Sequence, residues 1–345
     1  RTTPPAAPDT ALATWSAVDR VRPDLTAMDR LLSSRVEVAR LRGRVAAGED
    51  DGVRADLTGF VAELFARLCP GEKEVALRDR ILRDIRAVLN VDIRMYGSSR
   101  SLFALAGSSD MDLCYVTVSD VDKSREVHAV ARRLRSRGYL EVLPIAHARV
   151  PIVKFKTREG LECDVCINNT LALHNTEMLR TYAQLDSRVR PLSFAVKWWA
   201  KQRGINNPPS GTLSSYAYVC MVIFFLQAGC SPPVLPNLQD DRLRELTSLP
   251  VEYDTDDTGV VRYTRSMPAL ADIMANHFDN RQSLGDLLVE FFVFYTCHFQ
   301  RTTDVASIRT ASTLKKKALW KPLDVKIVAD RLSIEDPFER TRDLG

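Results

Sequence analysis

The chain has 345 residues, which exceeds one average domain and suggests two domains, each long enough to bury a core. Its formal net charge of +4 permits a polyanionic partner but falls short of the strongly basic surface typical of a dedicated nucleic-acid binder. The longest apolar stretch, which starts at Tyr216, is too short to span a bilayer, so we expect no membrane segment.

The chain opens with a Pro-rich segment that begins at Arg1 instead of Met. We expect this segment to be mobile, and we expect the sequence to be trimmed, with any targeting peptide removed. The first clearly periodic element comes later, where residues 73–90 place apolar side chains at helical spacing.

Short strand-like runs dominate the next part of the chain. They cover 91–97, 111–118, 141–157 and 161–168, and a basic helix over 122–138 separates the second run from the third. This alternation predicts an α/β module built on a small mixed sheet.

After Asn169 the pattern becomes helical, and no internal repeat is evident. Helices are predicted near 174–188, 191–203, 213–228, 236–248 and 284–299. We therefore predict an α+β fold with a sheet domain over 55–169 and a mainly helical domain over 170–345, which part of 1–54 joins.

Three acidic residues occur within the strand-like runs. Asp110 and Asp112 are two residues apart, so a strand points both to the same side of the sheet. Asp164 lies on another run that is able to pair beside the first. Carboxylates that converge on one sheet face repel each other unless cations lie between them, and three of them suit two Mg²⁺ ions for phosphoryl or nucleotidyl transfer.

A small, sharp turn at Gly97 and Ser98 precedes these acids. A residue without a side chain lets the backbone approach a triphosphate, and the next amide and hydroxyl are able to bind its oxygens. The alternative is a surface turn followed by solvated acids. The combination of turn, strand context and later acid favours the nucleotide site.

The Gly-Ser pair, the D-x-D motif and the third acid together resemble the DNA polymerase β-type nucleotidyltransferase superfamily. Residues 164–222 and the closing segment LSIEDPFERTRDLG are similar to terminal uridylyltransferases and related poly(A)/poly(U) polymerases. The resemblance implies a catalytic palm over 55–169, a nucleotide-recognition domain over 170–345 and an active-site cleft between them. The short span from Asp112 to Asp164 matches the minimal two-domain members known from trypanosomatids.

The resemblance assigns roles to particular residues. Asp110, Asp112 and Asp164 match the metal-binding acids, with Mg²⁺ as the cofactor and Mn²⁺ as an alternative; the third acid also helps to activate the RNA 3′-hydroxyl. Asn169 and Asn175 match asparagines that contact the ribose 2′-hydroxyl and the base edge. For Asn169, a simple turn residue after a strand is the alternative.

Lys197 and Lys201 match lysines that bind the β- and γ-phosphates. They are four residues apart and therefore share a helix face, where two ammonium groups disfavour each other unless an anion lies between them. A solvated helix face is the alternative for this pair.

The remaining roles concern the γ-phosphate and the base. The resemblance implies that Ser215 binds the γ-phosphate, that Tyr216 stacks under uracil, and that Asp336 and Glu339 read the base edge. Arg342 stands where studied uridylyltransferases have a histidine that favours uracil over adenine. An arginine is able to bind a uracil carbonyl or to turn towards phosphate, so uridine preference depends on this position.

Two further features are open. Lys315 to Lys317, with Trp320, either track an RNA backbone or form a solvated face, and Arg132, Arg133 and Arg135 are weaker candidates for RNA contact. Seven scattered cysteines indicate reduced thiols in an intracellular setting. The C-x-x-C pair Cys163 and Cys166 lacks the second pair that a zinc site needs, so we expect packing roles.

The sequence thus predicts a template-independent RNA 3′-terminal uridylyltransferase that uses UTP and two Mg²⁺. A poly(A) polymerase of the same family is the alternative; an RNA-binding subunit without catalysis and a small-molecule nucleotidyltransferase are less favoured. We expect an RNA 3′ end as partner, with an RNA-processing or RNA-editing complex as a further one. The expected compartment is mitochondrial, with the cytoplasm as the alternative.

Overall fold

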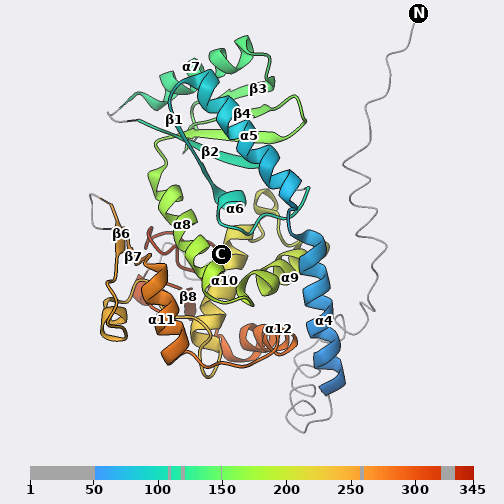
Figure 1. Ribbon diagram of the computed structural model, residues 1–345, viewed down its shortest axis with the longest axis vertical. Coiled ribbons are helices and arrows are strands. Elements are labelled where there is room, and N and C mark those ends of the chain that lie inside the picture. The colour runs from blue at the N-terminus through green and yellow to red at the C-terminus, as the bar shows by residue number, and fades with distance from the viewer. Residues whose placement is uncertain (1–50, 108–109, 118–120, 149, 257–259, 320–330) are drawn as a thin grey trace, which may run out of the picture.

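The computed structural model describes residues 51–345 except 108–109, 118–120, 149, 257–259 and 320–330 (Figure 1). Within these residues, no helix combines the length and the apolar character that crossing a membrane requires. The chain forms an upper part built on a sheet and a lower part built mainly of helices, and one helix, α8 (Thr170–Leu185), runs from the first into the second.

The upper part is a mixed sheet of five strands in the order β1-β2-β5-β4-β3. β2 and β5 are parallel, and every other neighbouring pair is antiparallel. The small mixed sheet predicted from the sequence is therefore confirmed. The strands are β1 (Asp92–Tyr96), β2 (Met111–Val116), β3 (Leu140–Ile145), β4 (Ile152–Lys156) and β5 (Glu162–Ile167).

Two amphipathic helices, α5 (Glu72–Leu89) and α7 (Lys123–Ser136), cover one face of this sheet. Their buried residues pack against Met111 and Leu113 of β2 and against Cys163 and Val165 of β5. Because side chains alternate along a strand, the residues between these point to the other face. That second face, opposite α5 and α7, is the one that carries the acidic residues.

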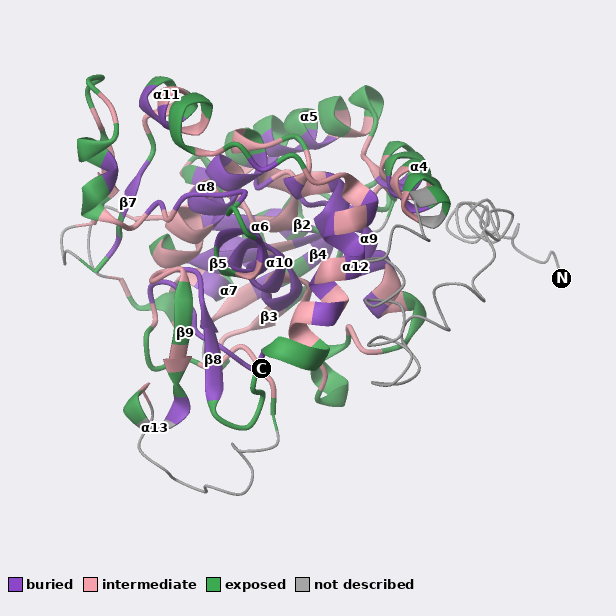
Figure 2. Cartoon of the chain, turned by 90° about the horizontal axis from the view of Figure 1, so that it is seen from below, coloured by how far each residue is buried: buried purple, intermediate pink, exposed green. Residues whose placement is uncertain are grey.

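The lower part has one large apolar core, which contains the predicted helix of residues 213–228 at its centre. This segment forms α10 (Ser215–Phe224) and a π-helical turn (Phe225–Gly229), and Figure 2 shows α10 buried among its neighbours. Ser214 begins the helix by accepting the backbone N–H of Ala217 on its hydroxyl. The other helices of this part are α9 (Val189–Gln202), α11 (Met267–His277), α12 (Leu284–Val293), which continues as a π-helical turn (Phe294–His298), and the short α13 (Lys316–Leu319).

The helix α4 (Asp51–Leu68) precedes the sheet in the chain but packs in the lower part. Val61, Leu64 and Leu68 belong to the large core, and α4 lies against α9 and α12. The core of the lower part thus includes a helix that comes before the sheet in the sequence. The helical periodicity after residue 169 did not indicate this contact.

Two small sheets also lie within the part predicted to be helical. The first has the order β10-β8-β9, formed by β8 (Asp304–Ser307), β9 (Ser312–Lys315) and β10 (Ser333–Ile334). The second pairs β6 (Tyr253–Thr255) with β7 (Arg262–Thr264). β10 is parallel to β8, and this pairing fixes the start of the closing segment that the sequence had singled out.

Two predicted elements need correction. The helix near 236–248 is wrong: only Asp241–Glu245 forms a short 3₁₀ helix, because Asn237 and Asp240 accept backbone N–H groups two residues ahead and hold the chain in turns. The run 141–157 is not one strand but two, β3 and β4, paired antiparallel across a turn.

Candidate active site

The acidic residues meet where β2 and β5 lie side by side. In the parallel register Asp112 is the partner of Asp164, and Asp110 comes directly before β2. All three lie on the sheet face opposite the one that α5 and α7 cover. We call Asp110, Asp112 and Asp164 the carboxylate cluster.

The carboxylate cluster carries uncompensated negative charge. Burial, and then the charges of Asp164 and Asp110, raise the pKa of Asp112 to about 7. Burial, Glu162 and Asp164 also raise the pKa of Asp110. One cation answers this charge directly: the Nζ atom of Lys154 on β4 lies 2.7 Å from a carboxylate oxygen of Asp164.

Gly97 is required at the turn because of Asp112. Its φ of +72° lies in the left-handed region, and a Cβ atom there would stand 2.0 Å from Oδ2 of Asp112. Its N–H donates to the hydroxyl of Thr176 on α8 at 2.9 Å. The glycine therefore lets the turn at α6 (Gly97–Arg100) press against the carboxylate cluster.

The donor set suits a magnesium ion that also binds a nucleotide. Within the described residues, no three His, Cys, Asp or Glu side chains gather closely enough to hold a metal without further ligands. Mg²⁺ is commonly bound by one or two carboxylates together with phosphate oxygens and water. Asp110 and Asp112, whose pKa values are raised first by burial and then by neighbouring acids, fit that partial role.

A cavity of about 660 Å³ lies between the carboxylate cluster and the lower part of the molecule. It brings together most of the residues predicted from the sequence, from segments far apart in the chain. Those that line it are Gly97, Ser98, Asp110, Asp112, Asn169, Asn175, Lys197, Ser215, Tyr216, Asp336 and Arg342. Asp164, Lys201 and Glu339 are not among its lining residues, although each neighbours one that is.

The two predicted phosphate lysines differ in their surroundings. Lys197 is buried, donates to the carbonyl of Phe103, and lines the cavity. Burial, and then the charge of Lys201, lower the pKa of Lys197 to about 7. Burial also lowers the pKa of Lys201, while Asp110 opposes this shift. Burial therefore disfavours the ammonium form of Lys197, and a nearby anion would offset this free-energy cost.

A hydrogen-bonded group forms the wall opposite the carboxylates. The Tyr216 hydroxyl donates to Oδ1 of Asn175 at 3.0 Å and lies 3.5 Å from Oδ2 of Asp336. These residues come from α10, α8 and the closing segment. The contacts fix the tyrosine ring at the cavity edge, in a position suited to stacking with a flat base.

The smaller polar residues sit at the ends of helices. Asn169 precedes α8 and makes no capping hydrogen bond with its side chain, so its amide is available to the cavity. Ser215 is the first residue of α10 and donates to Oδ1 of Asn206 at 2.9 Å. Ser98 lies in the turn beside Gly97.

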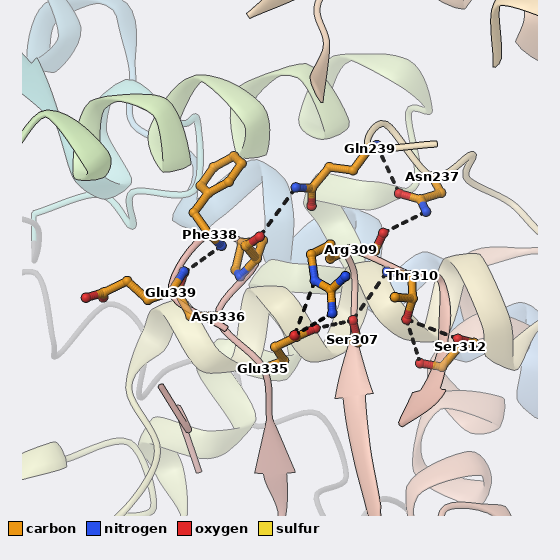
Figure 3. Close-up of polar contacts among 11 residues, drawn as sticks. Asn237, Gln239, Ser307, Arg309, Thr310, Ser312, Glu335, Asp336, Phe338 and Glu339 are labelled. Atoms are coloured by element: carbon orange, nitrogen blue, oxygen red, sulfur yellow. Dashed lines mark hydrogen bonds and ion pairs between the residues drawn. The ribbon is translucent and has the colours of Figure 1, made fainter. Parts of the chain in front are cut away.

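The closing segment is held by a second acidic group. The Glu335 carboxylate is fully buried and accepts from Ser307 and from Arg309, whose NH2 atom is 2.7 Å away (Figure 3). Oδ1 of Asp336 accepts the backbone N–H groups of Phe338 and Glu339, each at 3.0 Å. We call these six residues the recognition cluster.

Arg342 and Glu339 lie at the rim of the cavity. Arg342 is paired with Glu339 at 2.8 Å and lies 3.7 Å from Asp336. Burial raises the pKa of Asp336, while the two backbone N–H groups and Arg342 oppose the shift. The predicted base-reading residues are thus together, with Arg342 as the cation among them.

Sequence reasoning missed four residues that shape the site. Lys154 pairs with Asp164, Thr176 anchors the Gly97 turn, and the Glu335–Arg309 pair holds the closing segment. Only Lys154 had a usable signal: the short turn at 157–160 sets the β4–β5 register that places Lys154 opposite Asp164.

The open features resolve in part. Lys316 is buried and donates to the carbonyl of Arg331, whereas Lys315 pairs with Asp304 but keeps an exposed side chain, so RNA contact at Lys315 stays a prediction; Trp320 lies outside the described residues. Arg133 and Arg135 donate to carbonyls of Leu89 and Val142, and Arg132 is exposed. Cys163 and Cys166 are buried and unbridged, and their spacing on β5 points them to opposite faces.

Two family models match the chain. One described as "Poly(A) RNA polymerase, mitochondrial-like, central palm domain" matches residues 57–184, and one described as "Cid1 family poly A polymerase" matches residues 283–342. The first covers the sheet together with α8, and the second ends at Arg342.

The similar proteins include both kinds of polymerase. The chain is 33% identical over 314 residues to terminal uridylyltransferase cid1 of Schizosaccharomyces pombe, which covers 84% of this chain and 73% of that protein. It is 32% identical over 308 residues to poly(A) RNA polymerase cid11 of the same yeast, covering 86% of this chain. The chain spans 59% of the length of that second relative.

The fold also matches a solved structure. A crystal structure of the Cid1 poly(U) polymerase with magnesium and 3′-dATP bound superposes with a TM-score of 0.71 at 33% identity. The match covers 84% of this chain and 87% of that one. It confirms the fold class predicted from the sequence.

Proposed function

Since the chain belongs to the Cid1 family of poly(A)/poly(U) polymerase nucleotidyltransferases, we propose that it adds uridylate from UTP to RNA 3′ ends without a template. The observation that carries the proposal is the single cavity that joins the carboxylate cluster to Tyr216, Asn175 and the closing segment. Such a cavity offers places for phosphates, for a cation and for a base at once.

In the proposed reaction the RNA 3′-oxygen forms a bond to the α-phosphorus of UTP, and pyrophosphate leaves. Asp110 and Asp112 hold magnesium, which supplies charge neutralisation and Lewis-acid polarisation of the phosphates when bound. Asp164, fixed by Lys154, takes the part of the third acid and accepts the proton of the 3′-hydroxyl. A second magnesium ion belongs to the same proposal.

The lower part binds and orients the nucleotide. Lys197 and Ser215 face the phosphates, and Asn169 faces the ribose from the start of α8. Phosphate near Lys197 favours its ammonium form and so offsets the burial that lowers its pKa. Most of these contacts are made with the triphosphate, so they bind every nucleoside triphosphate alike.

In this proposal the preference for uracil over adenine depends on the residues at the rim of the cavity. Uracil offers two carbonyl acceptors around an N–H donor, and the rim offers a guanidinium, Arg342, beside the carboxylates of Asp336 and Glu339. An adenine would present its donors and acceptors in a different order and leave a polar group unpaired, at a cost of about 1–3 kcal/mol. The alternative, a poly(A) polymerase, is favoured by the similarity to cid11.

Primer extension with each of the four nucleoside triphosphates tests the proposal. We expect UTP to be used best, and we expect Glu339→Ala and Arg342→Ala to lower the UTP/ATP ratio of kcat/KM. Arg340→Ala, at a neighbouring exposed arginine, is the matched control and leaves the ratio unchanged. A wild-type preference for ATP would replace the proposal with the poly(A) polymerase alternative, and no extension with any nucleotide would reject both.

A further inference from the structure

A second cavity, of about 720 Å³, lies on the other side of α8 from the nucleotide cavity. The helix divides its side chains between the two: Asn175, Thr176 and Leu179 line the nucleotide cavity, whereas Glu177 and Arg180 line the second one. Both the sheet part and the lower part contribute to its walls. We call this the rear cavity.

Arginines dominate the walls of the rear cavity, and each comes from a different segment. They are Arg86 on α5, Arg94 on β1, Arg100 on α6, Arg180 on α8 and Arg265 directly after β7. Three acids, Asp79, Glu177 and Asp254, also line it. The five arginines and three acids give the lining two more cations than anions.

The acids of the lining do not neutralise the charges of all its arginines equally. Glu177 pairs with Arg100 at 2.6 Å, and Asp254 is taken up by His174, whose Nδ1 is 2.9 Å away. Arg180 donates to the backbone carbonyl of Arg100 and so lies beside a like charge. Burial and that neighbour both lower its pKa. An anion in the rear cavity would relieve this crowding.

The two outermost arginines are bound to acids outside the lining. Arg94 pairs with Asp92 at 2.8 Å, and Arg265 lies 3.7 Å from Glu252, and both arginine side chains are 56% exposed. Such exposed pairs contribute little to stability and exchange readily for another anion. Arg94 belongs to the sheet part and Arg265 to the lower part, so one ligand is able to contact both.

The rear cavity is not purely polar. Leu82, Met95, Leu173 and Met267 also line it, and these partly apolar walls suit a base or ribose. Guanidinium groups provide two-pronged donors for phosphate oxygens. A ligand with phosphates and flat apolar parts matches this lining better than a bare ion does.

We propose that the rear cavity is a second binding site for a phosphate-bearing ligand, which the single-stranded RNA substrate supplies through its backbone. The RNA source rests on the proposed function, because that function brings RNA to the protein. The phosphate chemistry of the site does not depend on it. RNA bound there contacts both parts of the molecule and is held away from the nucleotide cavity.

The test is the affinity of the full chain for a short labelled oligouridylate, measured by fluorescence anisotropy over a range of salt concentrations. The double variant Arg94→Glu with Arg265→Glu should weaken RNA binding by about tenfold or more, since it replaces two phosphate contacts by repulsion. The slope of log affinity against log salt should fall in magnitude by about 1.4, because each single-strand contact contributes about 0.7. The KM for UTP should not change.

Two matched variants make the outcome specific. Arg242→Glu reverses an exposed arginine outside both cavities and should leave RNA affinity unchanged; Arg94→Lys with Arg265→Lys should retain most of it. Equal affinity of wild type and the double glutamate variant, or an equal loss in Arg242→Glu, would overturn the RNA assignment.

Calorimetric titration of inorganic tripolyphosphate into wild type and into the double glutamate variant distinguishes RNA from a free phosphate compound as the ligand of the rear cavity. Loss of a tripolyphosphate site in the double variant without any effect on RNA would assign the rear cavity to a free phosphate ligand. Absence of both effects would reject the site. Wild type that binds RNA through this site but extends it with no nucleotide would reject the proposed function and leave the rear cavity standing.

Discussion

The carboxylate cluster and the recognition cluster are both acidic, but their charges are compensated differently. In the first, Lys154 pairs with Asp164 and Lys201 acts on Asp110, yet burial and neighbouring acids raise the pKa values of Asp110 and Asp112. In the second, Glu335 accepts from Arg309 and Ser307, and Asp336 accepts from two backbone N–H groups, which oppose the rise in its pKa that burial causes. Uncompensated charge on a rigid sheet marks a place for a ligand, whereas compensated charge fixes the shape of a segment.

The difference has a physical cause. A charge that is buried without a partner costs folding free energy, so it persists where a bound cation or nucleotide offsets that cost. A charge that is buried with hydrogen-bonded partners is tied to one geometry, and removal of either partner leaves the other exposed to the full penalty. Substitutions in the two clusters should therefore separate activity from stability.

The largest effect is expected at Asp112. Asp112→Asn removes a charge that the neighbouring acids repel, so extension should fall by at least about a thousandfold while the thermal midpoint without magnesium stays equal or rises. Primer extension and thermal unfolding of the same preparation measure the two quantities. Asp279→Asn, at an exposed residue that lines neither cavity, is the control. A folded Asp112→Asn protein with near wild-type extension would refute the assignment.

The opposite pattern is expected at Glu335. Glu335→Ala leaves Arg309 without its buried anion, and we expect the free energy of unfolding to fall by about 3 kcal/mol. Denaturant unfolding measures it. If the loss comes from the unpaired charge, Glu335→Leu combined with Arg309→Met should recover part of it. Additive effects of the two single changes would show that the pair is not coupled.

Tyr216 lines the same cavity as Asp110 and Asp112 and contacts Asp336 of the recognition cluster, and two substitutions separate the role of its ring from that of its hydroxyl. Tyr216→Ala removes the ring and should raise the KM for UTP by an amount equivalent to about 1–3 kcal/mol, the value of one base stack. Tyr216→Phe keeps the ring and loses only the hydrogen bond to Asn175, so its effect should be near 1 kcal/mol or less. Equal effects of both variants would place the base away from the ring.

A further effect is expected in the pH dependence of nucleotide binding. The pKa of Lys197 is lowered to about 7, so its ammonium group is lost from the free protein as the pH rises above 7. The KM for UTP should then rise by up to about tenfold per pH unit. Lys197→Met should raise KM at pH 6 and abolish this rise.

Stability should move in the other direction over the same range. Between about pH 7 and the unfolded pKa near 10.4, the unfolded chain binds a proton at Lys197 that the folded chain does not, so this residue makes the free energy of unfolding increase with pH. Comparison of wild type with Lys197→Met isolates the contribution. If neither the KM for UTP nor the stability difference between the two proteins changed over this range, Lys197 would be charged throughout.

The sequence by itself determined the features that depend on neighbouring residues. Strand alternation placed Asp110 and Asp112 on one face, helical spacing placed Lys197 with Lys201, and the Gly97 turn was located in front of them. These inferences needed no knowledge of distant contacts. The same reasoning failed at 236–248, where side-chain bonds to the backbone outweigh helical periodicity.

Only the tertiary structure decided which distant segments meet. The approach of Gly97 to Asp112, the Glu335–Arg309 pair and the docking of α4 on α9 and α12 all join parts of the chain that no local pattern relates. The rear cavity is of this kind as well, since each of its arginines looks like an ordinary surface residue in the sequence. Local patterns set which face a side chain takes, but its partners depend on how the whole chain packs, because that packing minimises the free energy of all contacts together.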